Sequence, residues 1–362
     1  MTTTMSAEVF PPGEYLRDEL QERGWTVTEF AEIIDRPVQA VSEILNGKKE
    51  ITTETACSFG EALGTSPELW LNLQTRYRLF NQRKGQARSE LTPVERRARL
   101  RNRVPLAKVR ARGWIPATED LDTLERAVAT FLGIETLDTE PAFALAARRA
   151  NSGEPLTLEQ TAWLAYVRAM AASRTVGAFD VEALSDLATR LPHLTASGPD
   201  ALPGLPQLFA ECGVVLVFVE GLQGGKLDGA VTFVGDGTPA VGLTTRGDRF
   251  DSVSFTLLHE CAHLVLKHLT PGDPVIVDDD LTDTQTDPNE IAANDQASAW
   301  LFPEGFEVHS GSVPAILEAA ERYDVHPSVV IGRLHWETDD WRRHRARIPK
   351  VRPHLIEAGL LS

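Results

Sequence analysis

The apolar segment FTLLHECAHLVLK carries two histidines and a glutamate whose spacing is suited to metal chemistry. His259 and His263 are four residues apart, so in a helix they lie one turn apart on the same face. Because apolar residues surround them on all sides, this helix is expected to be buried, and burying unpaired polar groups costs several kcal/mol. A zinc ion (Zn²⁺) bound by both imidazoles would offset that cost. The H-E-x-x-H pattern then makes Glu260 the general base on a metal-bound water.

The alternative is that these are two core histidines hydrogen-bonded to their neighbours. A catalytic zinc ion uses three protein ligands and a water molecule, so a third ligand is needed. Glu290 in DPNEIAANDQ is the best candidate, and Asn294 lies one turn further on, where it can orient one of the histidines. Glu290 also has a structural interpretation, because Asp287 as N-cap and Pro288 as the first helical residue would make it part of a capping box.

Two further features of this region have both a functional and a structural interpretation. His326 in HPSVVIGRL is a candidate catalytic residue that would polarise a carbonyl or hold an oxyanion, but a His-Pro pair can simply mark a helix boundary. Residues 273–290 hold seven acidic side chains and no basic ones, which predicts a solvated loop between two helices. The alternative for this loop is a gate that favours basic substrates.

The elements around these residues are predicted from apolar periodicity. Three β-rich runs precede a series of helical patterns, which predicts an α+β domain with a small sheet behind a helical layer. The expected strands are 214–219, 230–234 and 240–245, and the expected helices are 251–269, 288–302, 312–324 and 327–337.

This region resembles the ImmA/IrrE family of zinc metallopeptidases across about residues 201–340. The resemblance is carried by HECAHLVLKH, by E-x-x-A-N followed by ASAWLFP, and by YDVHPSVVIGRLHWE. It implies a zincin-like fold, with His259, His263 and Glu290 as zinc ligands and Glu260 as the catalytic base.

The first 80 residues have a different pattern, that of short amphipathic helices separated by turn signals. We expect helices at about 13–23, 28–34 with Thr28 as its N-cap, 37–45 opening at Pro37, 54–63 and 66–80. Within them, residues 27–44 fit a helix-turn-helix, with Asp35 in the turn as a residue that tolerates positive φ.

The exposed face of the second helix in this motif carries side chains suited to DNA. Amide and hydroxyl groups can read base edges, and flanking cations can hold phosphates. The predicted DNA contacts are Arg36, Gln39, Ser42, Glu43, Asn46, Lys48 and Lys49. A compact helical bundle with no DNA function is the alternative.

Residues 11–80 resemble the HigA-type antitoxin branch of the XRE helix-turn-helix family, most closely in ILNGKKEIT and SPELWLNLQ. The resemblance implies a homodimer that binds palindromic operator DNA. Residues 1–80 hold seven Lys or Arg against thirteen Asp or Glu, so a single copy would bind DNA weakly. Dimerisation, or help from the basic stretch 81–112, is therefore expected. That stretch could instead pack on acidic partners.

Composition limits the remaining possibilities. A net charge of −16 argues against a generic nucleic-acid coat, and three widely spaced cysteines indicate neither disulfides nor a thiolate zinc site. No long apolar run or leader pattern occurs, so we expect no membrane partner and a cytoplasmic location. The predicted domains are a HigA-like DNA-binding domain at 1–80, a basic then Ala/Leu-rich helical connecting region at 81–200, and a metallopeptidase-like domain at 201–362.

These features predict a mostly helical α+β protein. We expect a DNA-binding transcriptional regulator, resembling an antitoxin, whose zinc-dependent endopeptidase domain hydrolyses a partner protein. The alternative is a non-catalytic antitoxin or repressor whose zinc domain only binds a toxin or senses a signal, so the sequence leaves enzymatic activity open.

Overall fold

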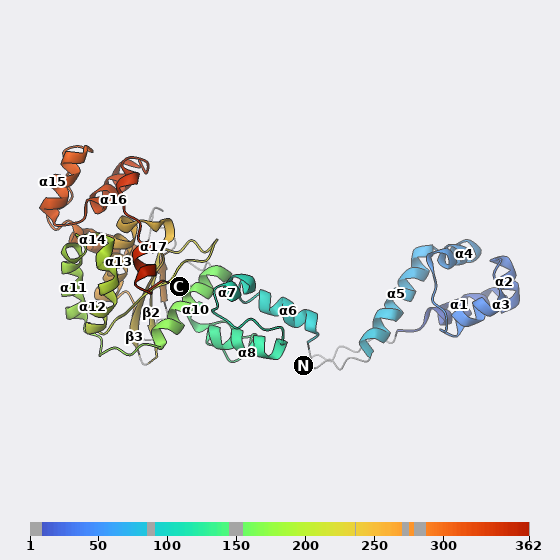
Figure 1. Cartoon of the computed structure of the whole chain (residues 1–362). Coiled ribbons are helices and arrows are strands. Elements are labelled where there is room, and N and C mark those ends of the chain that lie inside the picture. Colours follow the sequence, from blue (N-terminus) through green and yellow to red (C-terminus); the bar gives the residue numbers. More distant parts are fainter. Residues whose placement is uncertain are drawn as a thin grey trace. The chain divides into compact units, whose positions relative to one another are not determined.

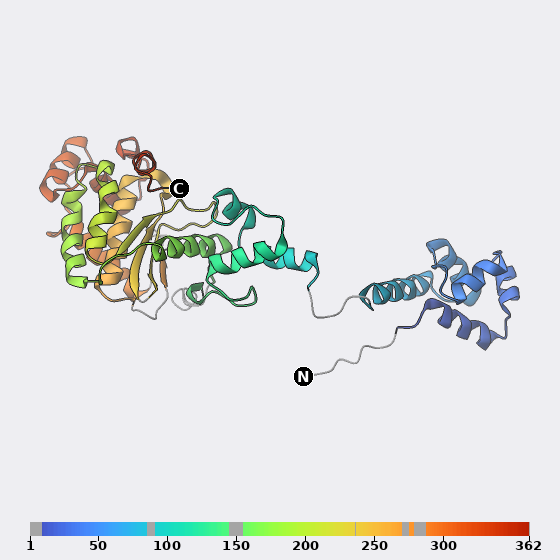
Figure 2. The same cartoon turned by 60° about the horizontal axis from the view of Figure 1, so that its bottom comes forward.

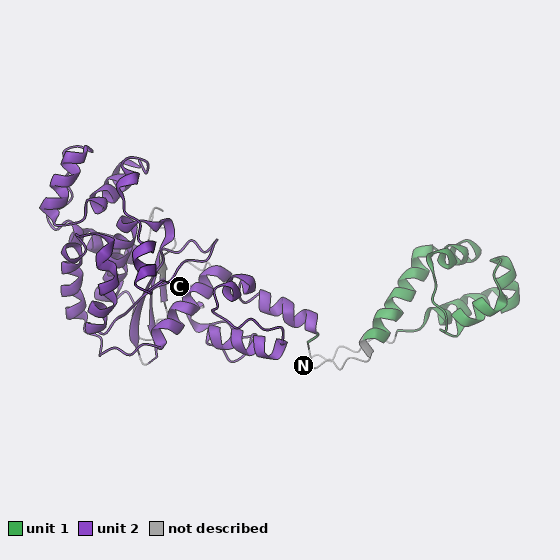
Figure 3. Cartoon of the chain, viewed as in Figure 1, with its two compact units in different colours: residues 1–92 green, residues 93–362 purple. Residues whose placement is uncertain are grey.

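The computed structural model describes residues 9–84, 91–144, 155–235, 237–269, 275–278 and 287–361. Figure 3 shows the two compact units into which the chain divides, residues 1–92 and residues 93–362. The structure confirms the α+β, mostly helical fold class, because the N-terminal unit is a helical bundle and the second unit combines helices with a small sheet (Figure 1). Within the described residues, no helix has both the length and the apolar character that crossing a membrane requires.

The N-terminal unit is a bundle of short helices around an aromatic core. Phe59 lies between Phe30 and Trp70, with ring centroids 5.3 Å apart in both pairs, and all three side chains are buried. Gly13 lets α1 pack directly on the end of α3, because a Cβ there would lie 2.5 Å from the carbonyl oxygen of Ile44. The helices are α1 (Pro12–Arg23), α2 (Val27–Ile33), α3 (Val38–Leu45), α4 (Thr53–Leu63) and α5 (Pro67–Lys84).

Two predicted helix starts in this unit are wrong. Thr26, and not Thr28, is the N-cap of α2: its hydroxyl accepts from the Glu29 backbone N–H at 3.2 Å. The Glu29 carboxylate in turn accepts from the Thr26 backbone N–H at 2.7 Å, which completes a capping box. Pro37 is the N-cap of α3, so the helix begins one residue later than expected, at Val38.

The second unit begins with helices from the basic stretch and the region after it. Acidic residues of the same unit pair with several of the basic side chains, as in the bidentate contact of Arg96 with Glu125 and the contact of Lys108 with Glu159 at 2.7 Å. These pairs favour the interpretation that the basic stretch 81–112 packs on acidic partners. The helices are α6 (Pro93–Arg101), α7 (Leu106–Ala111), α8 (Leu121–Leu132), α10 (Leu158–Ala172), α11 (Val181–Leu194) and α12 (Leu205–Glu211).

The segment 198–206, which its prolines and glycines mark as a linker, belongs instead to the core of this unit. It forms the 3-10 helix η1 (Pro199–Gly204) and the start of α12, with Leu202 and Leu205 buried. Pro199 and Pro206 stand at the starts of η1 and α12, where a helix tolerates proline, and Pro203 lies within η1.

A sheet of order β1-β3-β2-β4 lies between α10 and α13. β1 is parallel to β3, whereas β2 is antiparallel to both β3 and β4. Figure 2 shows helices on both sides of this sheet. Alternate side chains face opposite sides: Val231 lies in the hydrophobic cluster that includes α13, and Ala230 lies in the cluster that includes α10. The strands are β1 (Val215–Phe218), β2 (Gly229–Val234), β3 (Thr238–Leu243) and β4 (Val275–Asp278).

The first three strands confirm the predicted runs, but β4 falls in the acidic stretch that was expected to be a loop throughout. Residues 273–274 and 279–286 of that stretch lie outside the described residues. The helices after the sheet also confirm their predictions. They are α13 (Phe250–Val265), α14 (Pro288–Leu301), α15 (Val313–Tyr323) and α16 (Pro327–Thr338). The short helix η2 (Arg246–Asp248) precedes α13, and η3 (Arg345–Arg347) and α17 (Arg352–Glu357) follow α16.

Candidate metal centre and nucleic-acid interface

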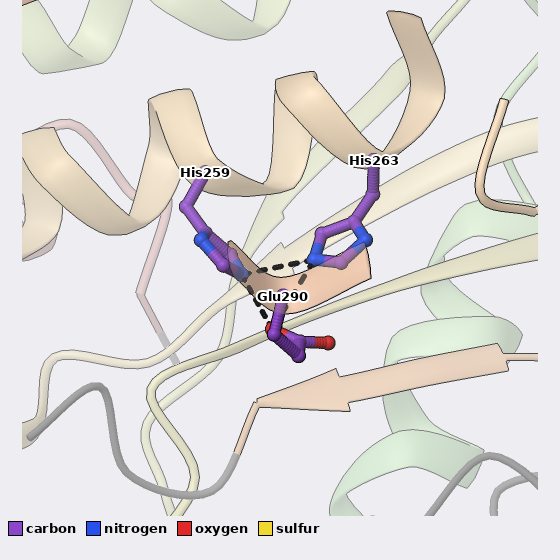
Figure 4. A group of neighbouring side chains, drawn as sticks. All are labelled: His259, His263 and Glu290. Carbon is purple, nitrogen blue, oxygen red and sulfur yellow. Dashed lines mark hydrogen bonds and ion pairs between the residues drawn. The ribbon is translucent and has the colours of Figure 1, made fainter. Parts of the chain in front are cut away.

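The buried helix α13 and the first turn of α14 bring His259, His263 and Glu290 together. Figure 4 shows both imidazoles projecting from α13 toward the Glu290 carboxylate. Glu290 Oε2 lies 3.2 Å from His259 Nε2 and 3.5 Å from His263 Nε2, and the two imidazole nitrogens are 2.9 Å apart. Both histidines are fully buried, and Glu290 is largely so.

This geometry fits a zinc ion. Ligand atoms about 2.1 Å from a tetrahedral zinc ion lie about 3.4 Å from one another. The two distances from Glu290 are close to that value, and one atom from each side chain lies within 4.8 Å of the others. The donor set of two imidazoles and one carboxylate leaves a fourth position for water, as in catalytic sites.

Electrostatics keep these side chains in the forms that bind metals. Burial raises the pKa of Glu290, but the interactions of its carboxylate with the imidazoles of His259 and His263 outweigh burial and lower the pKa to about 2. Burial lowers the pKa of His263, which favours the neutral imidazole. A carboxylate and a neutral imidazole are the ligating forms of these residues.

Neighbouring side chains fix the orientation of both histidines. Asn294 Oδ1 lies 2.9 Å from His259 Nδ1, as predicted for a residue one turn beyond Glu290. His268 Nδ1 lies 3.2 Å from His263 Nδ1, a contact that sequence reasoning missed. Lys267 has a φ of 58°, and this left-handed residue turns the chain so that His268 faces back onto α13. In each pair, an N–H on Nδ1 of the ligand histidine leaves its Nε2 lone pair toward the metal position.

Glu260 is fully buried and packs against β2. The contact depends on Gly229, because a Cβ at that position would collide with Glu260 Oε1 and lie 2.8 Å from Thr256 Cγ2. Since Gly229 faces α13, the absence of a side chain there makes room for the carboxylate. A sequence reading has no signal for this contact, because it joins residues 31 positions apart.

The structure does not bring His326 to this cluster. Its imidazole packs edge-on against Phe250, with ring centroids 5.3 Å apart, at the N-terminal end of α13. Phe250 is nine residues before His259, which corresponds to about 13 Å along a helix. His326 is the N-cap of α16, where Nδ1 accepts from the Ser328 backbone N–H at 3.1 Å. Burial lowers the pKa of His326.

The predicted helix-turn-helix is formed by α2 and α3. Ala31, Ile34, Val41 and Ile44 are buried as the pattern requires, and Asp35 takes a φ of 48° in the turn. All seven predicted DNA contacts lie in or beside α3. Gln39, Asn46, Lys48 and Lys49 are exposed, and Arg36, Ser42 and Glu43 are half-buried.

Some of these side chains already contact one another or a neighbouring helix. Arg36 pairs with Glu54 at 2.8 Å, and Gln39 donates to Glu43 at 3.2 Å. Sequence reasoning missed one feature of this surface: Val38, the first residue of α3, is 42% exposed. An exposed valine at the start of a recognition helix is suited to contact with a thymine methyl group.

The fold of the N-terminal unit thus defines a helix-turn-helix domain, and sequence comparison agrees. Residues 16–70 match the family HTH_3, described as Helix-turn-helix. An uncharacterised HTH-type transcriptional regulator of Escherichia coli, YddM, is 34% identical over 68 residues, which cover 19% of this chain and 72% of that protein. An uncharacterised HTH-type transcriptional regulator of Haemophilus influenzae is 37% identical over 70 residues, which cover 19% of this chain and 65% of that protein.

A solved structure, an addiction module antidote protein of a HigA family from Coxiella burnetii, is 33% identical. The match covers 24% of this chain and 98% of that chain, with a TM-score of 0.22. Because the chain matches 72% of the E. coli protein at 34% identity, it belongs to the helix-turn-helix family. Its N-terminal unit is a domain of the type found in transcriptional regulators.

Proposed function

We propose that the protein is a transcriptional regulator that binds operator DNA through its N-terminal unit and hydrolyses a partner protein at a zinc centre in its second unit. The observation that supports the peptidase half is the cluster of His259, His263 and Glu290, in which the carboxylate lies from both imidazole nitrogens at about the spacing of ligands on a tetrahedral zinc ion. This centre is the one that the resemblance to the ImmA/IrrE metallopeptidases implies.

The DNA-binding half rests on family membership and on the exposed polar surface of α3. Residues 1–80 carry a net charge of −6, from seven cations and thirteen carboxylates, so one copy would have little non-specific attraction to DNA. We therefore infer that the protein binds as a homodimer, in which two recognition helices read two half-sites and double the number of base contacts.

In the hydrolytic step, Glu260 acts as the general base. Zinc, when bound, would supply Lewis acidity that activates a water molecule and polarises the peptide carbonyl. Glu260 accepts the proton of the attacking water and passes it to the leaving amine, so that one carboxylate serves both proton transfers. Asn294 and His268 hold the two histidines in place, and the apolar packing of α13 excludes bulk water from the site.

A Glu260→Gln variant tests this assignment. The amide keeps the shape of the side chain but cannot accept the proton, so the variant should bind zinc like the parent protein and lose cleavage by roughly two to four orders of magnitude. The measurement is zinc content together with cleavage of the proteins encoded by neighbouring genes. Glu304→Gln changes an exposed glutamate and serves as the control. Unchanged cleavage by the Glu260→Gln variant would refute the base assignment.

A second function is favoured by the comparisons, which match the N-terminal unit to regulators and to an antidote protein. In this alternative, the second unit binds a toxin or a signal at a metal site and hydrolyses nothing. A protein that binds zinc and operator DNA, captures the product of a neighbouring gene and leaves it intact would support the alternative.

A further inference from the structure

A cavity of about 260 Å³ lies near the N-terminal end of α13, and its lining includes Arg246 and Gly247 just before that helix. Segments that are far apart in the sequence form its walls: the loop 221–227 after β1, Arg246 just before α13, Arg352 at the start of α17, and Glu159 of α10. None of the residues of the proposed metal centre lines it.

The charged lining of this cavity is predominantly basic. Three cations, Lys226, Arg246 and Arg352, line it together with one carboxylate, that of Glu159. Lys108 from outside the lining contacts that carboxylate at 2.7 Å, and the resulting hydrogen bond lowers the pKa of Glu159. In a chain with a net charge of −16, such a local excess of cations favours an anionic ligand.

Each of the two arginines is held in position by a carboxylate. Arg246 Nη1 lies 3.3 Å from Asp228 Oδ2, and Arg352 Nη1 lies 3.1 Å from Glu220 Oε1. Arg352 Nε also donates to Thr245 Oγ1 at 3.1 Å. A guanidinium has five N–H donors, more than the contacts of Arg352 through Nε and Nη1 use. Anchored side chains lose less conformational entropy when a ligand binds.

The backbone around the cavity is also shaped for close approach. Gly224 and Gly247 have φ values of 95° and 75°, and Lys226 takes a left-handed φ of 46°, which is uncommon for a residue with a side chain. Non-glycine residues in this region concentrate at ligand sites. Asp248 accepts hydrogen bonds from the backbone N–H groups of Val351 and Arg352, at 3.0 and 2.9 Å, which fixes the start of α17.

We propose that this cavity binds a compact anion that carries phosphate groups, of about the size of pyrophosphate. The planar guanidinium group of arginine matches the geometry of phosphate oxygens, and glycines bring the backbone close to the ligand. The volume of about 260 Å³ is below the range of roughly 300 to 1,000 Å³ that is usual for drug-sized ligands, so a small anion fits it best. This proposal is independent of zinc and of peptidase activity.

The test is isothermal titration of the full chain with pyrophosphate, in a buffer free of phosphate and DNA. The parent protein should bind it, and the Arg246→Gln and Arg352→Gln variants should each lower the affinity roughly ten- to hundredfold, as expected for the loss of a charge-assisted hydrogen bond. Arg347→Gln removes an exposed cation of η3 outside the cavity and should bind like the parent. Adenosine, which has no phosphate, should not bind.

A further variant covers the risk that loss of an anchored arginine disturbs folding. Lys226→Gln removes a charge from the exposed loop, leaves both anchored arginines in place and should also weaken binding. Absence of binding by the parent protein would overturn the proposal. Equal affinity in the parent and in all three cavity variants would overturn it too, because the anion would then bind elsewhere.

Discussion

At the scale of residues, the candidate metal centre depends on how the two ligand histidines are oriented. Each of them contacts a side chain through Nδ1, which leaves Nε2 directed at Glu290. The two contacts differ in origin, because Asn294 comes from the neighbouring helix α14, and His268 comes from the turn that ends α13 itself. Both contacts restrict rotation of an imidazole that would otherwise have to be ordered when the metal binds.

A His268→Ala variant should lower zinc affinity roughly 10- to 100-fold, because His263 loses the partner that orients its ring. Competition with a chromophoric chelator measures this affinity. His309→Ala, which removes an exposed histidine elsewhere in the same unit, should leave the affinity unchanged. Equal affinities in the His268→Ala variant and the parent would show that the contact does not orient the ligand.

The sequence predicts the cluster and the contact of Asn294 with one of the histidines, but not the rest of the surroundings. The i and i+4 spacing of His259 and His263 is local, so a helical pattern is enough to place them together. His268 depends on the left-handed turn at Lys267, and the role of Gly229 depends on how a strand packs on a helix. The position of His326 shows the same limit: its sequence motif resembles a family feature, but tertiary packing places it at the other end of α13.

At the scale of elements, close packing of β2 on α13 holds Glu260 in place. A methyl group at position 229 would overlap the carboxylate, and neither the strand nor the buried helix can move away easily. The packing of β2 on α13 therefore favours glycine at position 229.

We expect Gly229→Ala to lower the free energy of unfolding by about 1 to 3 kcal/mol, the usual cost of overpacking. Urea denaturation of the second unit measures it. Gly221→Ala is the matched control, because a Cβ at Gly221 would meet nothing closer than 3.7 Å and should cost little. A Gly229→Ala protein as stable as the control would mean that β2 and α13 accommodate the extra methyl group without strain.

The start of α2 offers a second test at this scale. Thr26→Ala removes the capping box with Glu29 and should cost about 0.5 to 2 kcal/mol of stability, whereas Thr28→Ala should cost little because Thr28 lies within the helix. The same denaturation experiment on the N-terminal unit compares them. A larger loss of stability for Thr28→Ala would instead support Thr28 as the N-cap of α2.

Helices and strands were predictable where their patterns are clear, as in the long apolar run of α13 and the amphipathic helices α3 and α15. The pattern of α2 was misread by two residues because two threonines, at 26 and 28, both resemble caps, and only the glutamate at 29 distinguishes them. β4 was missed because its apolar core, Val275 to Val277, is short and lies among carboxylates. Its pairing with β2 supplies the stability that its sequence alone does not indicate.

At the scale of the whole molecule, two units with separate cores carry two proposed activities. The aromatic core around Phe30, Phe59 and Trp70 belongs entirely to the N-terminal unit, and the metal centre belongs entirely to the second. Each unit should therefore fold and bind its own ligand without the other.

Residues 1–92 alone should form a folded, DNA-binding fragment. Chelation of metal from the full chain should change its affinity for operator DNA by no more than about twofold, well below the tenfold change that corresponds to 1.4 kcal/mol. Fluorescence anisotropy with promoter DNA from upstream of the gene, with and without EDTA, measures it. A large change on chelation would instead show that the two units are coupled.

The most direct test of the account is the metal content of the purified protein. The account predicts about one zinc ion per chain, as a site with three protein ligands requires. It also predicts that the His259→Ala and Glu290→Ala variants remain folded and lose the metal, while the exposed-site control His309→Ala keeps it. A folded parent protein that binds no divalent metal even when zinc is added, or variants that retain zinc in full, would contradict the metal centre and the peptidase function built on it.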